Sequence, residues 1–353
     1  MTEGIENNNG RLKAVTLISV FAFVAVFATM LALASVYDLE ISKILTNGNL
    51  AEGEYYSSNG FGLFFEAFGA TPIWFVIAFS GVILFWNVPA LKQIKMKISD
   101  KGKNALCVFL MIVCAVVVLV GFYFFISETF KYVFEHMGNE DYKHNGYVVA
   151  LEVFVALPLS VLLIFAWKNF DEKTHKKLLR FALVMIFTAI FYLLIEVIKG
   201  PVGRMRFRTM NYLGDFSGYT PWYQINGKRN ILDFVDDSCK SFPSGHTFSA
   251  AVIYSLLCLP SLFEKLNKPW IKALFYVGTI GYTMIVAISR IVVGAHFMSD
   301  VLFGGTIAFV ASMLGKEMFV DGFKHFKCFG KNSNADKGDA EISHNGFSEE
   351  DAK

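Results

Sequence analysis

Two short patterns in the C-terminal half of the chain combine residue types that could handle a phosphoryl group. In the first, Ser289 and Arg290 are followed after five residues by His296 and after three more by Asp300. On a helix, residues four apart lie on one face, so the Asp300 carboxylate could fix the tautomer of the His296 imidazole and stabilise its charged form. The other ring nitrogen would then be free to attack an electrophile. The same pair could also be an ordinary local hydrogen bond at a helix start.

The second pattern is Pro243-Ser244-Gly245-His246, which stands directly before an apolar stretch. A helix start offers unpaired backbone N–H groups and a partial positive charge, and both suit a phosphate oxygen. Gly245 would let that oxygen approach the backbone closely, and the Ser244 hydroxyl could donate a further hydrogen bond. Taken alone, Pro-Ser-Gly is also a common turn sequence.

A basic cluster precedes the second pattern. Lys199 is followed by three arginines, Arg204, Arg206 and Arg208. Glu196 lies three residues before Lys199, so the two could pair on a helix and hold the ammonium group in place. Guanidinium groups match the oxygens of a phosphoryl group in transfer, and Arg290 adds another fixed cation. Basic residues at a membrane edge also anchor helices or meet lipid headgroups.

Membrane-spanning helices are the elements that would position these residues. Of the 353 residues, 54% are hydrophobic and only 18% are charged, whereas soluble domains carry about 25% charged residues. A spanning helix needs about 20 mostly apolar residues. Eight runs meet or approach that length: Ala14–Tyr37, Thr71–Ala90, Ala105–Ile126, Tyr147–Trp167, Leu179–Ile198, Thr247–Leu262, Ile271–Ile288 and Ser299–Met318. We therefore predict an all-α, polytopic membrane bundle of about eight helices, whose short sixth run could be partly interfacial.

The placement of lysine predicts the orientation of these spans in the plasma membrane. Lysine-rich segments follow the second, fourth, sixth and eighth runs, whereas the segment after the first run is acidic. By the positive-inside rule, the lysine-rich ends and both termini are cytoplasmic. The loop 199–245, Arg290 and the segment from His296 to Asp300 then share the extracytoplasmic face. The basic cluster after the fifth run is the exception to the charge pattern, which invites a functional reason for it.

Other features of the chain are less specific. The five cysteines have neither zinc spacing nor the pattern of a disulfide framework. A basic start followed by Ala32-Leu33-Ala34 would also suit a cleaved signal peptide, although the apolar stretch is longer than usual. Residues 326–353 are rich in polar and charged residues and are predicted to form a disordered cytoplasmic tail.

Together, these patterns resemble the three-part signature of the type 2 phosphatidic acid phosphatase superfamily. The parts are Lys199 with Arg206 after six residues, Pro243-Ser244-Gly245-His246, and Ser289-Arg290 with His296 and Asp300. The superfamily includes lipid phosphate phosphatases, isoprenyl diphosphate phosphatases, soluble acid phosphatases, glucose-6-phosphatase and vanadium haloperoxidases. The resemblance covers residues 179–318. It implies a six-helix phosphatase core, which we place at residues 101–325, with residues 1–100 as an added N-terminal pair of spans.

The resemblance also implies a role for each matching residue. His296 would be the nucleophile that forms a phosphohistidine, and Asp300 would orient it. His246 would protonate the leaving alkoxide and later activate water. The cations that would hold the phosphoryl oxygens are Lys199, Arg206 and Arg290, and the further hydrogen-bond donors are Ser244 and Gly245. This is covalent catalysis in two displacements with acid–base help, and it requires neither a metal nor a cofactor.

One position departs from the family pattern. The first part usually ends Arg-Pro, whereas Arg206 is followed here by Phe207. Proline shapes the backbone and is not a ligand, so we expect Arg206 to keep its role, with Arg204 and Arg208 as rivals. The long connection from Phe207 to Ser241 could be a packed surface lobe, a lid beside the site or part of an interfacial aromatic belt.

These features predict an integral membrane phosphatase that acts on a lipid phosphate monoester or an isoprenyl diphosphate. A phosphotransferase or a sugar-phosphate phosphatase of the same superfamily is the alternative. A transporter is a distant alternative, since Glu152 and Glu196 are the chief ionisable residues within the spans. The predicted partners are the lipid substrate and the bilayer, with no nucleic acid, and the oligomeric state is not predicted.

Overall fold

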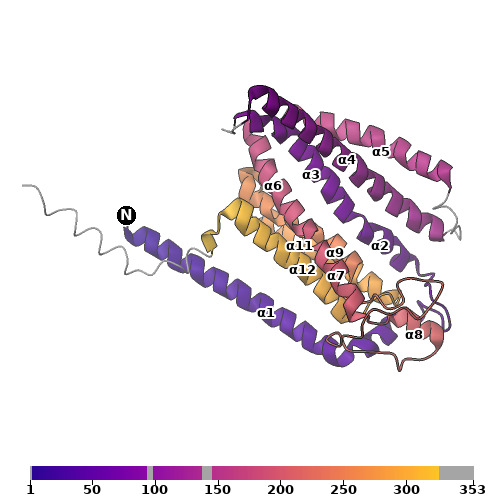
Figure 1. Cartoon of the computed structure of the whole chain (residues 1–353). Coiled ribbons are helices and arrows are strands. Elements are labelled where there is room, and N and C mark those ends of the chain that lie inside the picture. The colour runs from indigo at the N-terminus through magenta and orange to yellow at the C-terminus, as the bar shows by residue number, and fades with distance from the viewer. Residues whose placement is uncertain (1, 94–97, 137–144, 326–353) are drawn as a thin grey trace, which may run out of the picture.

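The computed structural model describes residues 2–93, 98–136 and 145–325. Within these ranges the chain is built of helices and contains no strand (Figure 1). The α-helices are α1 (Thr2–Thr46), α2 (Gly60–Ala70), α3 (Pro72–Asn87), α4 (Asp100–His136), α5 (Gly146–Ala166), α6 (Glu172–Ile190), α7 (Tyr192–Val202), α8 (Phe207–Leu213), α9 (Gly245–Ala251), α10 (Leu259–Leu262), α11 (Pro269–Val292) and α12 (Met298–Lys316). Three short 3-10 helices, η1 (Val88–Gln93), η3 (Val252–Cys258) and η4 (Glu264–Leu266), and a π-helical turn, η5 (Glu317–Asp321), complete the described elements. The predicted tail, residues 326–353, lies outside the described residues.

In the described part of the chain, eight helical spans are long and apolar enough to cross a membrane. They are Lys13–Thr46, Gly60–Gln93, Asp100–Phe134, Gly146–Ala166, Glu172–Leu213, Gly245–Leu262, Pro269–Val292 and Met298–Asp321. Each of them overlaps one predicted run. The prediction of an all-α polytopic bundle is therefore confirmed, and the chain is a multi-pass membrane protein.

The short sixth span lies inside the bundle. It consists of α9, η3 and α10 in succession, and 72% of its apolar window is buried, the largest share among the described spans. Helices α2, α11 and α12 pack around α9. Gly304 of α12 comes so close that a Cβ there would lie 2.4 Å from the Ser244 carbonyl oxygen. A short central helix of this kind is shielded from lipid by its neighbours.

The second span is interrupted between α2 and α3, where Pro72 begins the second helix. Ser249 of α9 bridges the interruption. Its hydroxyl donates to the Ala70 carbonyl oxygen at 2.8 Å and accepts from the Ile73 backbone N–H at 3.2 Å. Backbone groups left unpaired at a helix break are costly away from water, so this serine makes the break tolerable inside the bundle. The two halves can then pack on different neighbours.

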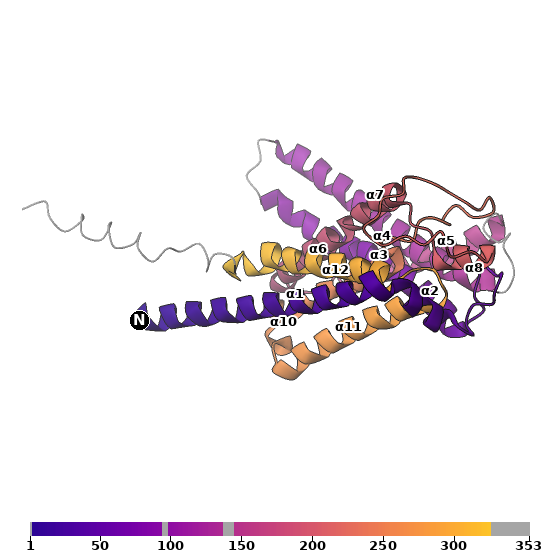
Figure 2. The ribbon, with the colours of Figure 1, turned by 90° about the horizontal axis from the view of Figure 1, so that it is seen from below.

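The two N-terminal spans are in direct contact with helices of the predicted phosphatase core. Helix α1 packs along α11 and α12 (Figure 2). The rings of Phe23 and Phe309 stack between α1 and α12 at 5.2 Å. Helices α2 and α3 pack against α4, α6, α9 and α11. The division of the chain at residue 100 stays a prediction. In the fold, these spans help to form the walls around the histidines.

Gly121 brings the backbones of α3 and α4 together. A Cβ at this position would lie 2.8 Å from the Ala78 backbone nitrogen, which cannot move unless α3 shifts. The substitution Gly121→Ile should therefore reduce the free energy of unfolding by about 1–3 kcal/mol. Gly278→Ile on α11 is the matched control, because nothing lies within 4 Å of a Cβ there. Thermal unfolding of both variants in detergent checks this, and equal midpoints would contradict the close contact.

Candidate active site

One end of the bundle gathers the residues that the sequence patterns singled out. Lys199 lies in the last turn of α7, His246 in the first turn of α9, Arg290 in the last turn of α11 and Asp300 in the first turn of α12. His296 lies in the connection between α11 and α12. Four successive spans, the fifth to the eighth, thus contribute their ends to one site.

His296 is presented by a tight turn after α11. Gly294 has a φ of 67°, which side-chain-bearing residues rarely adopt, and it reverses the chain before the histidine. The imidazole is buried, and its Nδ1 lies 2.6 Å from the Ser241 carbonyl oxygen. A carbonyl can only accept, so Nδ1 carries the proton and Nε2 keeps its lone pair. This Nε2 lies 3.4 Å from Nη1 of Arg206.

The charge state of His296 suits a nucleophile. Burial lowers the pKa of His296 to about 4; the neighbouring charge of Arg206 acts in the same direction, and Asp300 opposes it. The ring is therefore neutral at pH 7. A neutral imidazole with an unprotonated Nε2 is the form that can attack phosphorus.

Asp300 contacts His296 through Ser241. The Asp300 carboxylate is 3.8 Å from Nδ1, which is too far for a hydrogen bond. Its Oδ2 instead accepts from the Ser241 hydroxyl at 2.5 Å and from the Phe297 backbone N–H at 2.8 Å. Its Oδ1 accepts from Arg204 at 2.6 Å. The orienting role expected of Asp300 stays a prediction, and in this geometry the Ser241 carbonyl, rather than Asp300, accepts the Nδ1 proton.

Arg206 is the arginine of its cluster that contacts His296. Its Nε and Nη1 donate to the carbonyl oxygens of Asp237 and Ala295, both at 2.8 Å, and its Nη2 pairs with the Asp237 carboxylate at 2.9 Å. Burial alone would raise the pKa of Asp237, but Arg206 and Arg208 hold this pKa well below its usual range. The guanidinium plane is therefore fixed beside Nε2 of His296.

The two rival arginines belong to other ion pairs. Arg204 is fully buried and pairs with Asp38 at 2.9 Å and with Asp300 at 2.6 Å. Arg208 pairs with the Asp237 carboxylate at 3.2 Å. The long connection that supplies Asp237 is therefore packed against the site. Of the three arginines, the geometry favours Arg206 for the position that the resemblance implies.

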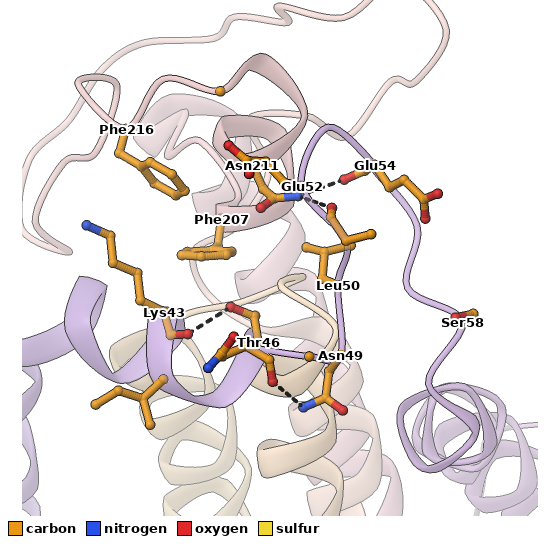
Figure 3. A pocket seen from close by; sticks show the side chains of 15 residues that line it. Lys43, Thr46, Asn49, Leu50, Glu52, Glu54, Ser58, Phe207, Asn211 and Phe216 are labelled. Carbon is orange, nitrogen blue, oxygen red and sulfur yellow. Dashed lines mark hydrogen bonds between the residues drawn. The ribbon is translucent and has the colours of Figure 1, made fainter.

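Phe207 stands where the family's proline is expected, at a backbone position that would also suit proline. It is the first residue of α8, after Arg206 in an extended conformation, and this is a position where proline fits well. The Phe207 side chain is 2% exposed and packs against Phe216 and Phe297. It also lines a cavity of about 730 Å³ between the end of α1 and α8, apart from both histidines (Figure 3). The departure from the pattern thus adds apolar packing.

Lys199 lies against the backbone at the start of α9. Its Nζ is 2.9 Å from where a Cβ of Gly245 would be, so glycine leaves room for the ammonium group. Nζ also donates to Glu196 Oε1 at 2.6 Å, which confirms the pair expected from their spacing. The Ser244 hydroxyl caps α9 by accepting from the Thr247 backbone N–H at 3.3 Å. The phosphate-binding role expected of Ser244 stays a prediction.

Arg290 is fully buried and pairs with Glu66 of α2 at 2.8 Å. It also donates to the Gly62 carbonyl oxygen at 2.5 Å. Each of the three cations expected to hold phosphate thus has a carboxylate partner: Lys199 with Glu196, Arg206 with Asp237 and Arg290 with Glu66. Such pairs hold the cations in place before a substrate binds, which is the arrangement that electrostatic catalysis needs.

His246 faces a cavity of about 410 Å³ and has a partner that the sequence patterns did not reveal. Its Nε2 lies 2.9 Å from the Tyr132 hydroxyl of α4. Residues 132 and 246 share no local pattern, so only the packing of α4 relates them. The charges of Lys199, Arg206 and Arg290 lie close enough to interact with the His246 ring. The two histidines are thus parts of one electrostatic environment.

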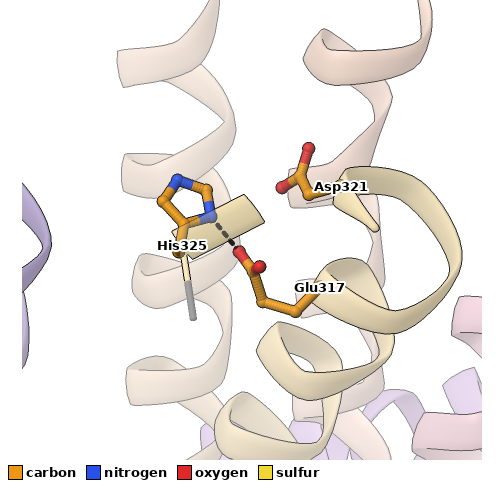
Figure 4. A group of neighbouring side chains, drawn as sticks. All are labelled: Glu317, Asp321 and His325. Atoms are coloured by element: carbon orange, nitrogen blue, oxygen red, sulfur yellow. Dashed lines mark hydrogen bonds and ion pairs between the residues drawn. The ribbon is translucent and has the colours of Figure 1, made fainter. Parts of the chain in front are cut away.

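A group of possible metal ligands lies at the other end of α12. Glu317, Asp321 and His325 bring one ligand atom each within 4.8 Å of one another (Figure 4). Lys316 and Lys324 pair with Asp321 at 2.9 and 3.2 Å, so its charge is already balanced. Helix α12 alone separates this group from the histidines by roughly 28 Å. The group therefore has no part in the site.

The fold and the site define a multi-pass helical membrane protein with a neutral, buried imidazole and fixed cations at one end of the bundle. Residues 177–322 match the model of the PAP2 superfamily. Over 101 residues the chain is 32% identical to phosphatidylglycerophosphatase B of Bacillus subtilis (strain 168), a stretch that covers 28% of this chain and 48% of that protein. The match of residues 177–322 to this superfamily agrees with the resemblance predicted from the sequence patterns.

The chain thus spans about half the length of this curated relative. No solved structure matches the chain.

The hydrogen bond between Tyr132 and His246 should contribute to turnover. Tyr132→Phe removes the hydroxyl and should lower kcat for phosphate release about 2- to 10-fold, the range expected for one hydrogen bond. Tyr123→Phe is the control, because this tyrosine of the same helix bonds Ser127 and Glu152. Steady-state phosphate release by both variants checks this. Equal kcat values for the two would remove Tyr132 from the site.

Proposed function

We propose that this protein is an integral membrane phosphatase that hydrolyses a lipid phosphate monoester through a phosphohistidine on His296. The observation that carries the proposal is the unprotonated Nε2 of His296 beside the fixed guanidinium of Arg206. His246 lies in the same electrostatic environment and faces a cavity. A nucleophile, a second imidazole and fixed cations are the parts that metal-free phosphoryl transfer uses.

The reaction would proceed in two displacements. Nε2 of His296 attacks phosphorus, the bond from phosphorus to the alkoxide oxygen breaks, and protonated His246 gives its proton to that oxygen. Water then attacks the phosphohistidine and gives its proton to His246, and the N–P bond breaks. Inorganic phosphate leaves, and both imidazoles regain their starting states. The net reaction consumes one water and yields an alcohol and phosphate.

The surroundings of His296 support the first displacement. When Nε2 binds phosphorus, the ring keeps its Nδ1 proton and becomes positively charged. The Ser241 carbonyl accepts the Nδ1 proton at 2.6 Å, and the Asp300 carboxylate lies 3.8 Å away. Both groups stabilise the charged ring. On the phosphoryl side, Arg206 and Lys199 would oppose the negative charge that spreads over the oxygens.

The walls of the cavity beside His246 favour a lipid over a sugar phosphate. The polar residues that line this cavity together with His246 are Glu128, Lys131 and Tyr132 of α4, Tyr192 of α7 and Ser249 of α9. The rest of the wall is mostly apolar: Ala70, Ile73, Trp74, Ile77, Ala189 and Leu193. Leu193 is 65% exposed, so the apolar wall continues onto the outer surface of the span. A headgroup beside His246 could therefore keep its chain in contact with the bilayer.

The relative from Bacillus subtilis agrees with this substrate class. Its name describes a phosphatase of phosphatidylglycerophosphate, a lipid that ends in a phosphate monoester. We extend this to the present chain as a lipid phosphate monoester, with isoprenyl diphosphate as the alternative. The active site would lie on the extracytoplasmic face of the plasma membrane. The opposite ends of the fifth to eighth spans adjoin the lysine-rich segments, which supports that orientation.

The substitution His296→Ala should abolish phosphate release from dioctanoyl phosphatidic acid in detergent micelles, because no nitrogen is left to take the phosphoryl group. His246→Ala should instead lower turnover by about 10²- to 10⁴-fold. With p-nitrophenyl phosphate, whose leaving group needs little protonation, the His246 variant should accumulate an acid-labile phosphoenzyme. Radiolabelled phosphate retained on the protein measures this.

His175→Ala serves as the control for these variants, since His175 lies at the start of α6, far along the span from the site. Phosphate release by folded His296→Ala protein would contradict the nucleophile assignment. Wild-type protein should release phosphate from phosphatidic acid and phosphatidylglycerophosphate faster than from glucose 6-phosphate, and glycerol should not become phosphorylated. The reverse substrate order or phosphorylated glycerol would favour the alternatives within the superfamily.

The proposed orientation predicts which loops can be labelled from outside the cell. In a variant with all five cysteines replaced, Lys228→Cys in the long connection should react with a membrane-impermeant maleimide in intact cells. Lys173→Cys at the start of α6 should react only after permeabilisation. Both positions are exposed, so the difference reports the side of the membrane. Labelling of Lys173→Cys alone in intact cells would place the site on the cytoplasmic side.

A further inference from the structure

Asp38, near the end of α1, is a fully buried carboxylate that reaches the catalytic end of the bundle. Its Oδ1 accepts from the Ser299 backbone N–H at 2.9 Å. Its Oδ2 accepts from Arg204 Nη2 at 2.9 Å and from the Ser299 hydroxyl. Arg204 in turn donates from Nη1 to Asp300 at 2.6 Å. One arginine thus joins a carboxylate of the first span to the carboxylate beside His296.

Both carboxylates in this group are ionised. Each oxygen of Asp38 accepts a hydrogen bond, and so does each oxygen of Asp300. The donors to all four oxygens include N–H groups, from Ser299 and Arg204 to Asp38 and from Arg204 and Phe297 to Asp300, and acceptance at both oxygens is the pattern of an ionised carboxylate. The group therefore holds two negative charges against the single positive charge of Arg204.

Arg204 lies in a fully buried environment, where the balance of charges has a strong effect on neighbouring groups. Arg204, Asp38 and Asp300 are all 0% exposed. The guanidinium carbon lies 4.2 Å from the centroid of the Phe297 ring, and Nε donates to the Thr220 carbonyl oxygen at 2.9 Å. Water does not screen charges in such a place, so each unit of charge acts strongly on its neighbours. If Asp300 were the only carboxylate paired with Arg204, the positive charge of Arg204 would cancel the negative charge that faces His296.

We infer that Asp38 is a positioning residue of the catalytic centre, which neutralises Arg204 so that the negative charge of Asp300 stays available to His296. This rests on the proposed function, in which His296 becomes positively charged when it carries the phosphoryl group. The surplus negative charge then lies on Asp300, whose carboxylate is 3.8 Å from Nδ1 of the charged ring. Asp38 touches neither substrate nor His296 and acts through Arg204 and Asp300. The first span, which the sequence suggests is only an addition, thereby supports the chemistry.

The test compares Asp38→Asn with Glu40→Gln, an exposed carboxylate two residues along the same helix. Wild-type phosphate release from dioctanoyl phosphatidic acid is measured first. If the wild type releases none, the proposed function fails; if it does, the variants decide the role of Asp38. Asp38→Asn should lower kcat about 10- to 100-fold, as for a hydrogen bond between charged groups, with KM changed less than twofold. Glu40→Gln should match the wild type.

Two further variants separate charge from shape. Asp38→Glu keeps the charge and should recover part of the lost kcat. The double variant Asp38→Asn/Arg204→Gln removes the arginine together with its counter-ion, so it buries no unpaired guanidinium. It should turn over faster than Asp38→Asn alone, because nothing then cancels Asp300.

Wild-type kcat in Asp38→Asn would overturn the inference, and so would a folded double variant slower than the single one. If Asp38→Asn does not fold, the double variant decides alone. A kcat within tenfold of wild type would support the charge role, and a larger loss in a folded protein would overturn it.

Discussion

The bridge that Arg204 makes between Asp38 and Asp300 is the interaction on which the site depends. All three side chains are fully buried, and removing one partner of a buried pair typically costs about 3–5 kcal/mol. The end of α1, the stretch after α7 and the start of α12 must therefore keep their relative positions. Asp300 in turn holds the Ser241 hydroxyl, and the Ser241 carbonyl holds Nδ1 of His296. The position of the imidazole follows from this chain of polar contacts.

At the same end of the bundle, the backbone outside the helices finds hydrogen-bond partners within the protein. Backbone outside helices must find partners when water is scarce. The stretch after α7 pairs with the segment before α9, where the Arg206 N–H donates to the Ser238 carbonyl oxygen at 3.0 Å and the Ser241 N–H donates to the Arg204 carbonyl oxygen at 3.0 Å. These bonds place Arg206 and Ser241 on either side of His296. The apolar bundle thus carries a site of charged groups at one end. The three cations expected to hold phosphate, Lys199, Arg206 and Arg290, are each paired with a carboxylate.

Sequence patterns predicted the eight spans, because the length of an apolar run reports directly on the bilayer. They also located His246, His296 and the basic cluster, because the chemistry of phosphate restricts residue types at close spacing. They could not choose among Arg204, Arg206 and Arg208, which differ only in what they face after folding. The same reason explains why sequence patterns did not reveal Tyr132, Glu66 and Asp38. Each of them lies on another helix, more than 100 residues along the chain from its partner.

Local composition therefore determined the class of protein, the spans and the residues able to do chemistry. Hydropathy and spacing act over a few turns of helix, so they can be read without knowing the fold. The tertiary structure decided which cation stands beside His296, which carbonyl sets its tautomer and which carboxylates balance the buried charge. Those choices depend on distances of a few ångströms between helix ends, and only packing brings such ends together. The first span shows the difference most clearly: by sequence it is an apolar helix, and in the fold it supplies a carboxylate to the end of the bundle that holds both histidines.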